Sequence, residues 1–212
     1  MINAKIVKKD LNLNNKFSEL KVNNIVSTVT FDISEKIDLL KIYNNIENTE
    51  YNPEKFPGLI LRTKIPKATF LIFSSAKMIL TGLKDETDAI KAVNIVTKKI
   101  EKVGINLQNP EIKIRNLVVS GNLHNSINLN KAAIELDTTM YEPEVFPALI
   151  YYMKNPVAVF LVFSNGKFIC TKIKNREELR DAVSKFTSII ENYYTKNDDY
   201  IDMDDSNNEI FI

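Results

Sequence analysis

The order of apolar and polar residues along the chain predicts short strands that alternate with amphipathic helices. Residues 20–31 alternate as a β-strand does, since side chains two positions apart share a face. Both faces are largely uncharged, which is unusual for a strand with one face in water. One face carries Val22, Asn24, Val26 and Thr28, and the other carries Ile25, Val29 and Phe31.

A short helix and a three-stranded meander are predicted next. Ser34 suits the N-cap of a helix whose apolar positions recur at helical spacing. Pro53 and Pro57 then interrupt regular structure. The helix is expected to bury Ile37, Leu40, Tyr43 and Ile46, and the strands are expected at 59–64, 68–73 and 77–81.

A long helix follows, and the same order of elements then recurs. Asp85 begins this helix and Gly104 ends it, and one further strand is expected at 105–107. Its apolar stripe consists of Ile90, Val93, Val96 or Thr97, Ile100 and Val103. The second round has strands at 111–121, 149–153, 157–163 and 167–173, a short helix at 129–137, and a helix carrying Leu179, Val183, Phe186, Ile189 and Tyr193.

The sequence itself repeats at this spacing. YNPEKFPGLI at 51–60 recurs as YEPEVFPALI at 141–150, and FLIFSSAKMILTG at 70–82 recurs as FLVFSNGKFICTK at 160–172. The chain is therefore a duplication. We predict a loose leader at 1–17, a first repeat at 18–108, a second repeat at 109–195 and an acidic tail at 196–212.

The number of elements predicts an exposed apolar surface. Four one-sided helices cover only one face of an antiparallel sheet of about ten strands, yet several strands are apolar on both faces. A large apolar face left bare indicates a binding surface, and a twisted sheet of that length is curved. The predicted fold class is α+β: a pseudo-two-fold duplicated saddle whose four helices lie on the convex face of the sheet.

Charge is unevenly distributed along the chain. The formal net charge is +1, but removing residues 196–212 leaves 27 Lys and Arg against 21 Asp and Glu, or +6. Such a body suits phosphate contacts, whereas the acidic tail is expected to be a solvated appendage or a competitor of DNA for the basic surface. The single cysteine, Cys170, excludes an internal disulfide, and no signal peptide or membrane span is evident.

Two phenylalanines lie 17 positions apart in each repeat, in strand or strand-edge sequence. An isolated phenylalanine in a strand is usually a core residue. Here each second member alternates with an apolar neighbour, so one of the two side chains must face away from the helices. The four candidates for an exposed grip are Phe56, Phe73, Phe146 and Phe163.

With its E-x-F-P core, the repeated motif resembles the TATA-box-binding protein family, the general transcription initiation factors of archaea and eukaryotes. The likeness runs from about Leu20 to Tyr194, and Pro57 and Pro147 after the phenylalanines resemble the archaeal branch. It implies that the four phenylalanines wedge into base steps of promoter DNA from the minor groove. It also implies cytoplasmic action at the archaeal nucleoid, or nuclear action if the source is eukaryotic.

The resemblance also assigns base-edge contacts. Asn24 and Asn116 occupy matching places near the pseudo-dyad, and an amide donor suits the N3 and O2 acceptors of A·T pairs. Thr81 and Thr171 match the family's hydroxyls beside these asparagines. Its apolar floor, which excludes the guanine amino group by shape, corresponds to Val26, Val118, Leu71, Leu161, Ile79 and Ile169.

Phosphate and protein contacts complete the expected interface. Phosphate contacts at the rim would come from Lys55, Arg62, Lys77 and Lys167. The second loop, with Glu142, Glu144 and Val145, resembles the family's docking site for transcription factor B. The implied partners are double-stranded promoter DNA, transcription factor B and the RNA polymerase pre-initiation complex, with a monomer on DNA and a possible dimer when free.

This chain departs from the family pattern at four positions. Tyr152 stands where the family places the second repeat's counterpart of Arg62. Ala76, Ala148 and Lys172 replace expected glycines. These changes favour weaker or asymmetric DNA contact.

Other functions stay open at this point. A divergent paralogue could keep the saddle as a protein-interaction module with weak or no DNA binding, and similar half-saddles grip substrates in nucleic-acid enzymes. The chain shows no catalytic constellation, because its single histidine, His124, has no pairing with Cys170. No cofactor, metal or membrane partner is expected.

Overall fold

The computed structural model describes residues 20–195, so the predicted leader and acidic tail lie outside the described residues. The first repeat contains β1 (Lys21–Asp32), α1 (Leu39–Asn45), β2 (Thr49–Glu50), β3 (Leu59–Lys64), β4 (Lys67–Ile72), β5 (Met78–Leu83) and α2 (Glu86–Lys102). The second contains β6 (Gln108–Asn122), α3 (Leu129–Glu135), β7 (Thr139–Met140), β8 (Ala148–Met153), β9 (Ala158–Phe163), β10 (Lys167–Ile173) and α4 (Arg176–Ile190), followed by a 3₁₀ turn at Glu191–Tyr193.

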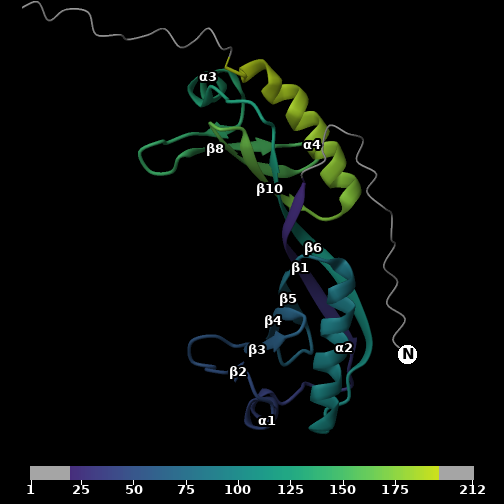
Figure 1. Ribbon diagram of the computed structural model, residues 1–212. Coiled ribbons are helices and arrows are strands. Elements are labelled where there is room, and N and C mark those ends of the chain that lie inside the picture. The colour runs from purple at the N-terminus through teal and green to yellow at the C-terminus, as the bar shows by residue number, and fades with distance from the viewer. Residues whose placement is uncertain (1–19, 196–212) are drawn as a thin grey trace, which may run out of the picture.

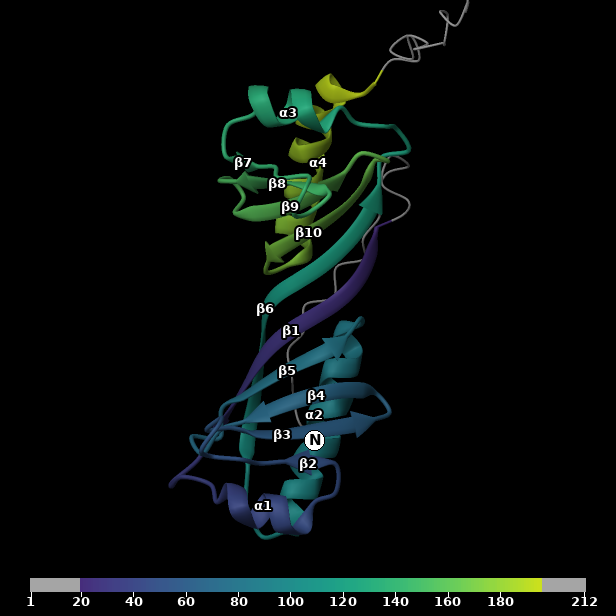
Figure 2. The same cartoon turned by 90° about the vertical axis from the view of Figure 1, so that its left-hand side faces the viewer.

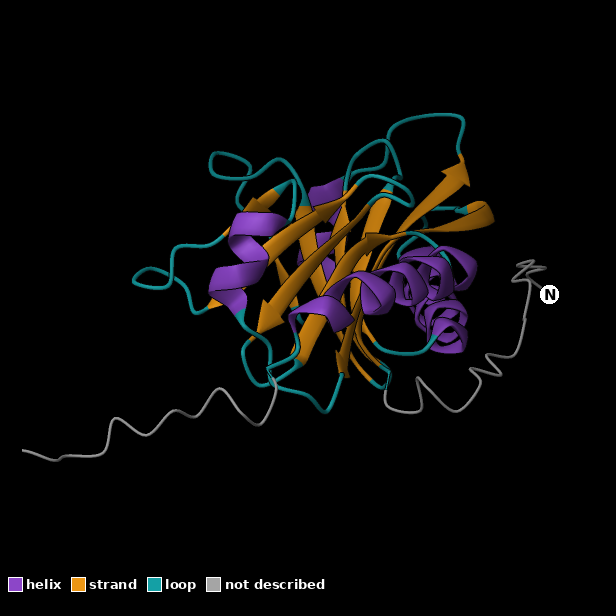
Figure 3. Ribbon diagram, turned by 90° about the horizontal axis from the view of Figure 1, so that it is seen from above, coloured by secondary structure: helices purple, strands orange, loops and turns teal. Residues whose placement is uncertain are grey.

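All of these strands join one antiparallel sheet, in the order β2-β3-β4-β5-β1-β6-β10-β9-β8-β7. The sheet is curved, and α2 and α4 lie along its convex side (Figure 1). The short helices α1 and α3 lie at the two outer ends (Figure 2). Seen from above, the long helices lie beside the layer of strands and not within it (Figure 3). The predicted saddle is confirmed.

The two repeats meet at the long central strands. Ile25 of β1 pairs with Leu117 of β6, and the flanking pairs are Asn24 with Val118 and Val26 with Asn116. Asn24 is equivalent to Asn116 and Val26 to Val118, so the two flanking pairs are related by a pseudo-two-fold axis that passes between the strands. The concave face therefore continues from one repeat into the other without a gap.

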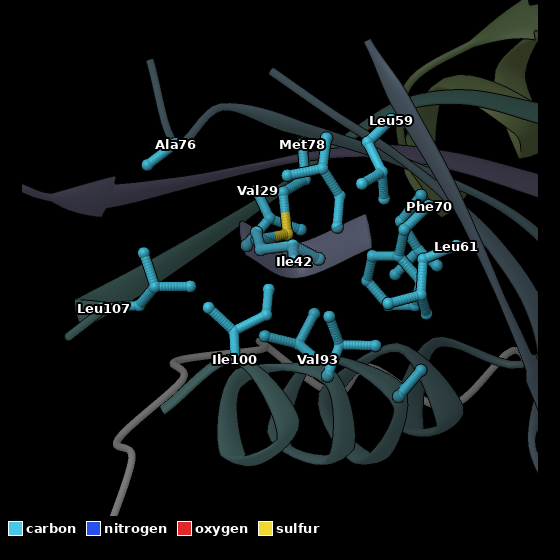
Figure 4. Packing of buried hydrophobic residues seen from close by; sticks show 14 of the residues in the cluster. Val29, Ile42, Leu59, Leu61, Phe70, Ala76, Met78, Val93, Ile100 and Leu107 are labelled. Carbon is cyan, nitrogen blue, oxygen red and sulfur yellow. The ribbon is translucent and has the colours of Figure 1, made fainter. Parts of the chain in front are cut away.

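Each repeat has its own hydrophobic core on the helix side of the sheet. In the first, Val93 and Ile100 of α2 pack beneath Phe70, Met78 and other sheet residues (Figure 4). In the second, Phe160 of β9 stacks on Phe186 of α4 with ring centroids 4.1 Å apart. Burying one such side chain contributes about 1.5–3 kcal/mol, so these contacts hold the helices to the convex side.

The first long helix begins where the sequence predicts, and the second has an equivalent cap. The carboxylate of Asp85 accepts a hydrogen bond of 2.7 Å from the Thr87 backbone N–H. Asn175 caps α4 in the same way, by accepting from Glu178 N at 2.8 Å. Gly104, at φ +77°, follows α2 in the left-handed conformation that ends many helices. Within residues 20–195, no helix is both long and apolar enough to span a membrane.

Three sequence predictions were wrong in detail. The first short helix is capped by Asp38 and not by Ser34, and Leu40 and Tyr43 are exposed while Leu39 and Ile42 are buried. Residues 105–107 form no strand, because β6 begins at Gln108. The count of ten strands is completed instead by β2 and β7, two-residue strands at the sheet edges.

One ion pair joins the two repeats on the convex side. Arg176 at the start of α4 donates from Nε to a carboxylate oxygen of Glu86 at the start of α2, at 2.9 Å. The two residues lie 90 positions apart, so they occupy the same place in the two repeats. The pair therefore lies across the pseudo-dyad.

Candidate nucleic-acid interface

The concave face of the sheet is a continuous, half-buried apolar floor. All six floor residues predicted from the sequence lie on it: Val26, Val118, Leu71, Leu161, Ile79 and Ile169. Cross-strand pairing adds Ile60 beside Leu71, Ile150 beside Leu161, Thr28 beside Ile79 and Ser120 beside Ile169. The family resemblance, which assigned the first six, did not name these four as floor residues, although alternation along the strand had already placed Thr28 on this face.

Asn24 and Asn116 lie at the centre of the floor, and backbone donors fix their orientation. The side-chain oxygen of Asn24 accepts from Gly82 N at 2.8 Å, and that of Asn116 accepts from Lys172 N at 2.8 Å. The hydroxyls of Thr81 and Thr171 donate to the same two oxygens, at 3.3 and 3.2 Å. Two side-chain N–H donors are therefore held at the middle of the apolar face.

The two amide nitrogens differ slightly in their surroundings. Asn24 Nδ2 lies 3.1 Å from Thr81 Oγ1 and can donate one of its two hydrogens there. Within residues 20–195, the Asn116 nitrogen has no protein acceptor. At least one N–H of each side chain is thus free to donate to a ligand on the concave side.

The four phenylalanines form two equivalent pairs. Phe56 and Phe73 meet edge to face with ring centroids 5.9 Å apart, and Phe146 and Phe163 do so at 6.3 Å. Phe56 is 36% exposed and Phe146 is 40% exposed, while their partners are half-buried. None of the four is a fully buried core residue, so each repeat presents an aromatic wedge.

The two wedges are not identical, because Gly58 corresponds to Ala148. A Cβ at Gly58 would lie 2.7 Å from Cε1 of Phe56 and 3.1 Å from Cε1 of Phe73. The second repeat carries that methyl group in Ala148, which is buried, and its two rings are farther apart. The missing glycine at Ala148 therefore has a local consequence in the spacing of the wedge.

Ala76 and Lys172 replace glycine at positions where the backbone has a positive φ. They adopt φ values of +56° and +66°, where their equivalents Gly166 and Gly82 adopt +80° and +94°. The left-handed region costs a residue with a Cβ about 1–2 kcal/mol. The turn at Ala76 and the irregularity within β10 at Lys172 both keep the conformation of a glycine without having one.

The four predicted rim cations are all exposed, but one has an acidic partner in the protein. The Arg62 guanidinium pairs with the Glu50 carboxylate at 2.5 Å. Glu50 faces the same side as Ile60, its partner across the β2–β3 pair. Sequence reasoning missed this pair, because β2 is too short to be recognised from its pattern.

At the outer end of the second repeat, apolar residues occupy the equivalent positions. Met140 corresponds to Glu50, Tyr152 to Arg62 and Val157 to Lys67, and all three are exposed. Tyr152 pairs with Val159 as Arg62 pairs with Thr69. The outer end of the sheet is therefore charged in the first repeat and apolar in the second.

The loop between β7 and β8 presents the predicted protein-docking residues to solvent. Glu142 and Glu144 are exposed, and Val145 is 80% exposed. The loop backbone forms a tight turn, in which Val145 N and Phe146 N donate hydrogen bonds to the Glu142 carbonyl, both at 2.9 Å. The loop thus holds two carboxylates and an apolar side chain beside the second aromatic wedge.

Cys170 lies on the opposite face of the sheet from this floor. It is fully buried in the second core, and burial raises the pKa of its thiol from 9.0 to about 12. His124 is exposed, in a turn at φ +56°. The two side chains therefore do not form a nucleophilic pair.

Comparison with known proteins agrees with this geometry. Residues 19–103 and 111–193 match the family described as transcription factor TFIID, or TATA-binding protein. The chain is 47% identical over 174 residues to a TATA-box-binding protein of Sulfurisphaera tokodaii, covering 81% of this chain and 87% of that protein. It is 42% identical over 172 residues to the Archaeoglobus fulgidus TATA-box-binding protein, covering 80% and 93%.

A solved structure has the same fold. The TBP of Methanococcus jannaschii superposes with a TM-score of 0.77 at 38% sequence identity. The alignment covers 82% of this chain and 99% of that chain. The fold is thus shared with a protein that carries this name.

Proposed function

The chain belongs to the TATA-binding protein family of general transcription factors, and on that premise we propose that it binds the minor groove of TATA-type promoter DNA. The family consists of DNA-binding transcription factors and not of enzymes. The observation that carries the proposal is the arrangement on the concave face. Fixed amide donors lie at the centre of an apolar floor, and an exposed aromatic pair lies at each end.

The floor and its donors favour A·T over G·C pairs. The minor-groove edge of an A·T pair offers the N3 and O2 acceptors, to which the N–H groups of Asn24 and Asn116 donate. A G·C pair adds an amino group at this edge, and apolar side chains such as Val26 and Val118 neither accept its hydrogen bond nor leave room for it.

The aromatic pairs bend the DNA. Minor-groove binding proteins, of which this family is a standard example, insert apolar side chains between base steps and kink the duplex. In this chain Phe56 and Phe73 enter one step, and Phe146 and Phe163 enter another. Unstacking costs a few kcal/mol per step and least at flexible TA steps, so deformability adds to sequence preference.

Phosphate contacts supply affinity without reading sequence. Lys55, Lys77 and Lys167 are exposed cations at the rim, and Arg62 joins them when it exchanges Glu50 for a phosphate. The repeats at 18–108 and 109–195 each contribute half of the interface to one duplex. The protein acts as a monomer on DNA, and two free molecules can cover their apolar floors by pairing.

The loop with Glu142, Glu144 and Val145 recruits the next factor. Its exposed valine and paired carboxylates suit a partner with an apolar pocket and basic residues, which we identify as transcription factor B. Transcription factor B in turn brings RNA polymerase to the promoter. As an archaeal-type factor, the protein acts in the cytoplasm, where the nucleoid lies.

A salt-dependent gel-shift comparison tests the proposal. We expect tighter binding to an A·T-rich promoter duplex than to a G·C-rich control of equal length, with affinity for both falling as salt rises. Equal and feeble binding to both duplexes would contradict the proposal. That result would favour the alternative, a protein-interaction module that has kept the saddle.

A further inference from the structure

Arg115 is the extra residue of a bulge in the central strand pair. Val26 pairs with Asn116 and the next residue, Ser27, pairs with Ile114, so Arg115 has no partner in β1. A bulge of this kind redirects the side chain of the unpaired residue. Arg115 therefore departs from the regular alternation and lies beside Asn116, at the centre of the concave face.

The Arg115 side chain is anchored on the concave side. Its Nε donates a hydrogen bond of 2.9 Å to Oγ1 of Thr28, and Thr28 lies opposite Ile79 on the apolar floor. A guanidinium group has five N–H donors in a fixed plane, so the terminal nitrogens are left for other acceptors. The contact with Thr28 thus orients the group without using its terminal donors.

Arg115 is also exposed, and it forms no ion pair within residues 20–195. The nearest carboxylate along its strand belongs to Glu111, which is paired with Lys113 at 2.9 Å. Arg62 differs in this respect because Glu50 neutralises it. Arg115 is therefore an oriented cation at the interface, and no acid in the described part of the chain forms an ion pair with it.

The equivalent residue of the first repeat carries no charge. Asn23 is skipped in the register of β1 between Val22 and Asn24, as Arg115 is skipped in β6. The outer ends show the opposite difference, since Arg62 of the first repeat corresponds to Tyr152 of the second. The second repeat has an arginine near the pseudo-dyad and none at the outer position.

We propose that Arg115 contacts the DNA backbone. The second repeat then has its arginine–phosphate contact at the centre of the interface, whereas the first repeat has its own at the outer end. The proposal rests on the proposed function. The planar guanidinium recognises a phosphate of the bound duplex, by charge-assisted hydrogen bonds from its terminal nitrogens. It reads no base, so it strengthens binding to all sequences equally.

The salt dependence of binding tests this role. Arg115→Asn gives the second repeat the residue of the first, and the dissociation constant is measured by fluorescence anisotropy at several salt concentrations. For one lost phosphate contact we expect the slope of log K against log salt to decrease in magnitude by about 0.9. We expect binding to weaken by about tenfold at low salt, to the same extent on A·T-rich and G·C-rich duplexes.

Two further variants make the result specific. Arg180→Asn makes the same substitution on the exposed side of α4, on the convex side, and is expected to leave the slope unchanged. Arg115→Lys keeps the charge and is expected to keep the slope. An unchanged salt slope for Arg115→Asn, or an equal decrease of the slope in Arg180→Asn, would overturn the assignment of Arg115. The proposed function would still stand in that case, because the wild type binds DNA. Absence of wild-type binding to either duplex would overturn both.

Discussion

The side-chain oxygen of Asn116 accepts a hydrogen bond of 2.8 Å from the backbone N–H of Lys172. A backbone N–H only donates, so the oxygen must face the protein and the NH₂ group must face away. Asn24 and Gly82 repeat this relationship at the same distance. The sheet backbone therefore determines that Asn24 and Asn116 present donors and not acceptors at the centre of the concave face.

Replacing that donor is the most direct test of the base-edge contacts. Asn116→Asp keeps an oxygen for Lys172 N and for the Thr171 hydroxyl, but it removes the NH₂ group and adds a negative charge. We expect the fold to persist and affinity for an A·T-rich site to fall by ten- to a hundredfold, or about 1–3 kcal/mol. Asn44→Asp, on the exposed surface of α1, controls for the added charge. Equal affinities of wild type and Asn116→Asp would exclude the contact.

Removing one aromatic wedge should separate bending from association. Phe163→Ala leaves the rim lysines in place, so binding to a G·C-rich duplex should change by no more than about twofold. Bending of an A·T-rich duplex, measured by fluorescence transfer between its ends, should decrease clearly. Tyr43→Ala removes an exposed aromatic ring from α1 and should leave the bend as it is. An unchanged bend in Phe163→Ala would refute the wedge.

The ion pair between Glu50 and Arg62 should compete with DNA. Glu50→Gln frees the guanidinium for a phosphate and removes a carboxylate from the interface. Because both side chains are about half exposed or more, the gain is small, about two- to fivefold in affinity. In an Arg62→Gln background, Glu50→Gln frees no arginine, so the increase in DNA affinity that comes from a freed arginine should be absent. Weaker binding by Glu50→Gln would contradict this competition.

Thr138 should be a site of avoidable backbone strain. It adopts φ +59°, a conformation that a β-branched residue rarely tolerates, while its counterpart Asn48 adopts +62°. We expect Thr138→Asn to raise the free energy of unfolding by about 0.5–1 kcal/mol and Asn48→Thr to lower it similarly. Urea unfolding measures both. Changes of the same sign in the two variants would show that strain does not dominate at this position.

The Cys170 thiol should make stability depend on alkaline pH. Its folded pKa, about 12, lies above the ordinary value of 9.0 because burial disfavours the thiolate. The stabilising contribution is complete below pH 9 and is lost as pH rises from about 9 to about 12, with a slope of up to about 1.4 kcal/mol per pH unit. Wild type should thus lose stability relative to Cys170→Ala between pH 8 and pH 10.5. If the unfolding free energies of wild type and Cys170→Ala changed in parallel with pH, the thiol would not be the cause of the pH dependence.

Alternation along the strands predicted most of the fold and the exposed apolar face, and the family resemblance assigned the floor residues on that face. The pattern of β1 separates Asn24 and Val26 from Ile25 and Val29, and the structure has the same division. Recurrence of that pattern in the second repeat predicted the symmetry. Strand alternation depends only on local geometry, which is why a single sequence was sufficient here.

What could not be predicted depends on contacts between distant segments. β2 and β7 have two residues each and exist only because β3 and β8 pair with them. The Glu50–Arg62 pair follows from that pairing, so it was missed as well. In α1, Leu39 and Ile42 are buried instead of Leu40 and Tyr43, because it is they that pack into the core of the first repeat.

The ion pair between Glu86 and Arg176 also bears on the ancestry of the molecule. In a homodimer of identical half-size subunits, symmetry would give both copies the same residue at this position, and two like charges would face each other. Opposite charges at matching positions require two separately inherited codons. This contact was therefore acquired after the two halves had come to be encoded separately, and it records their independent divergence.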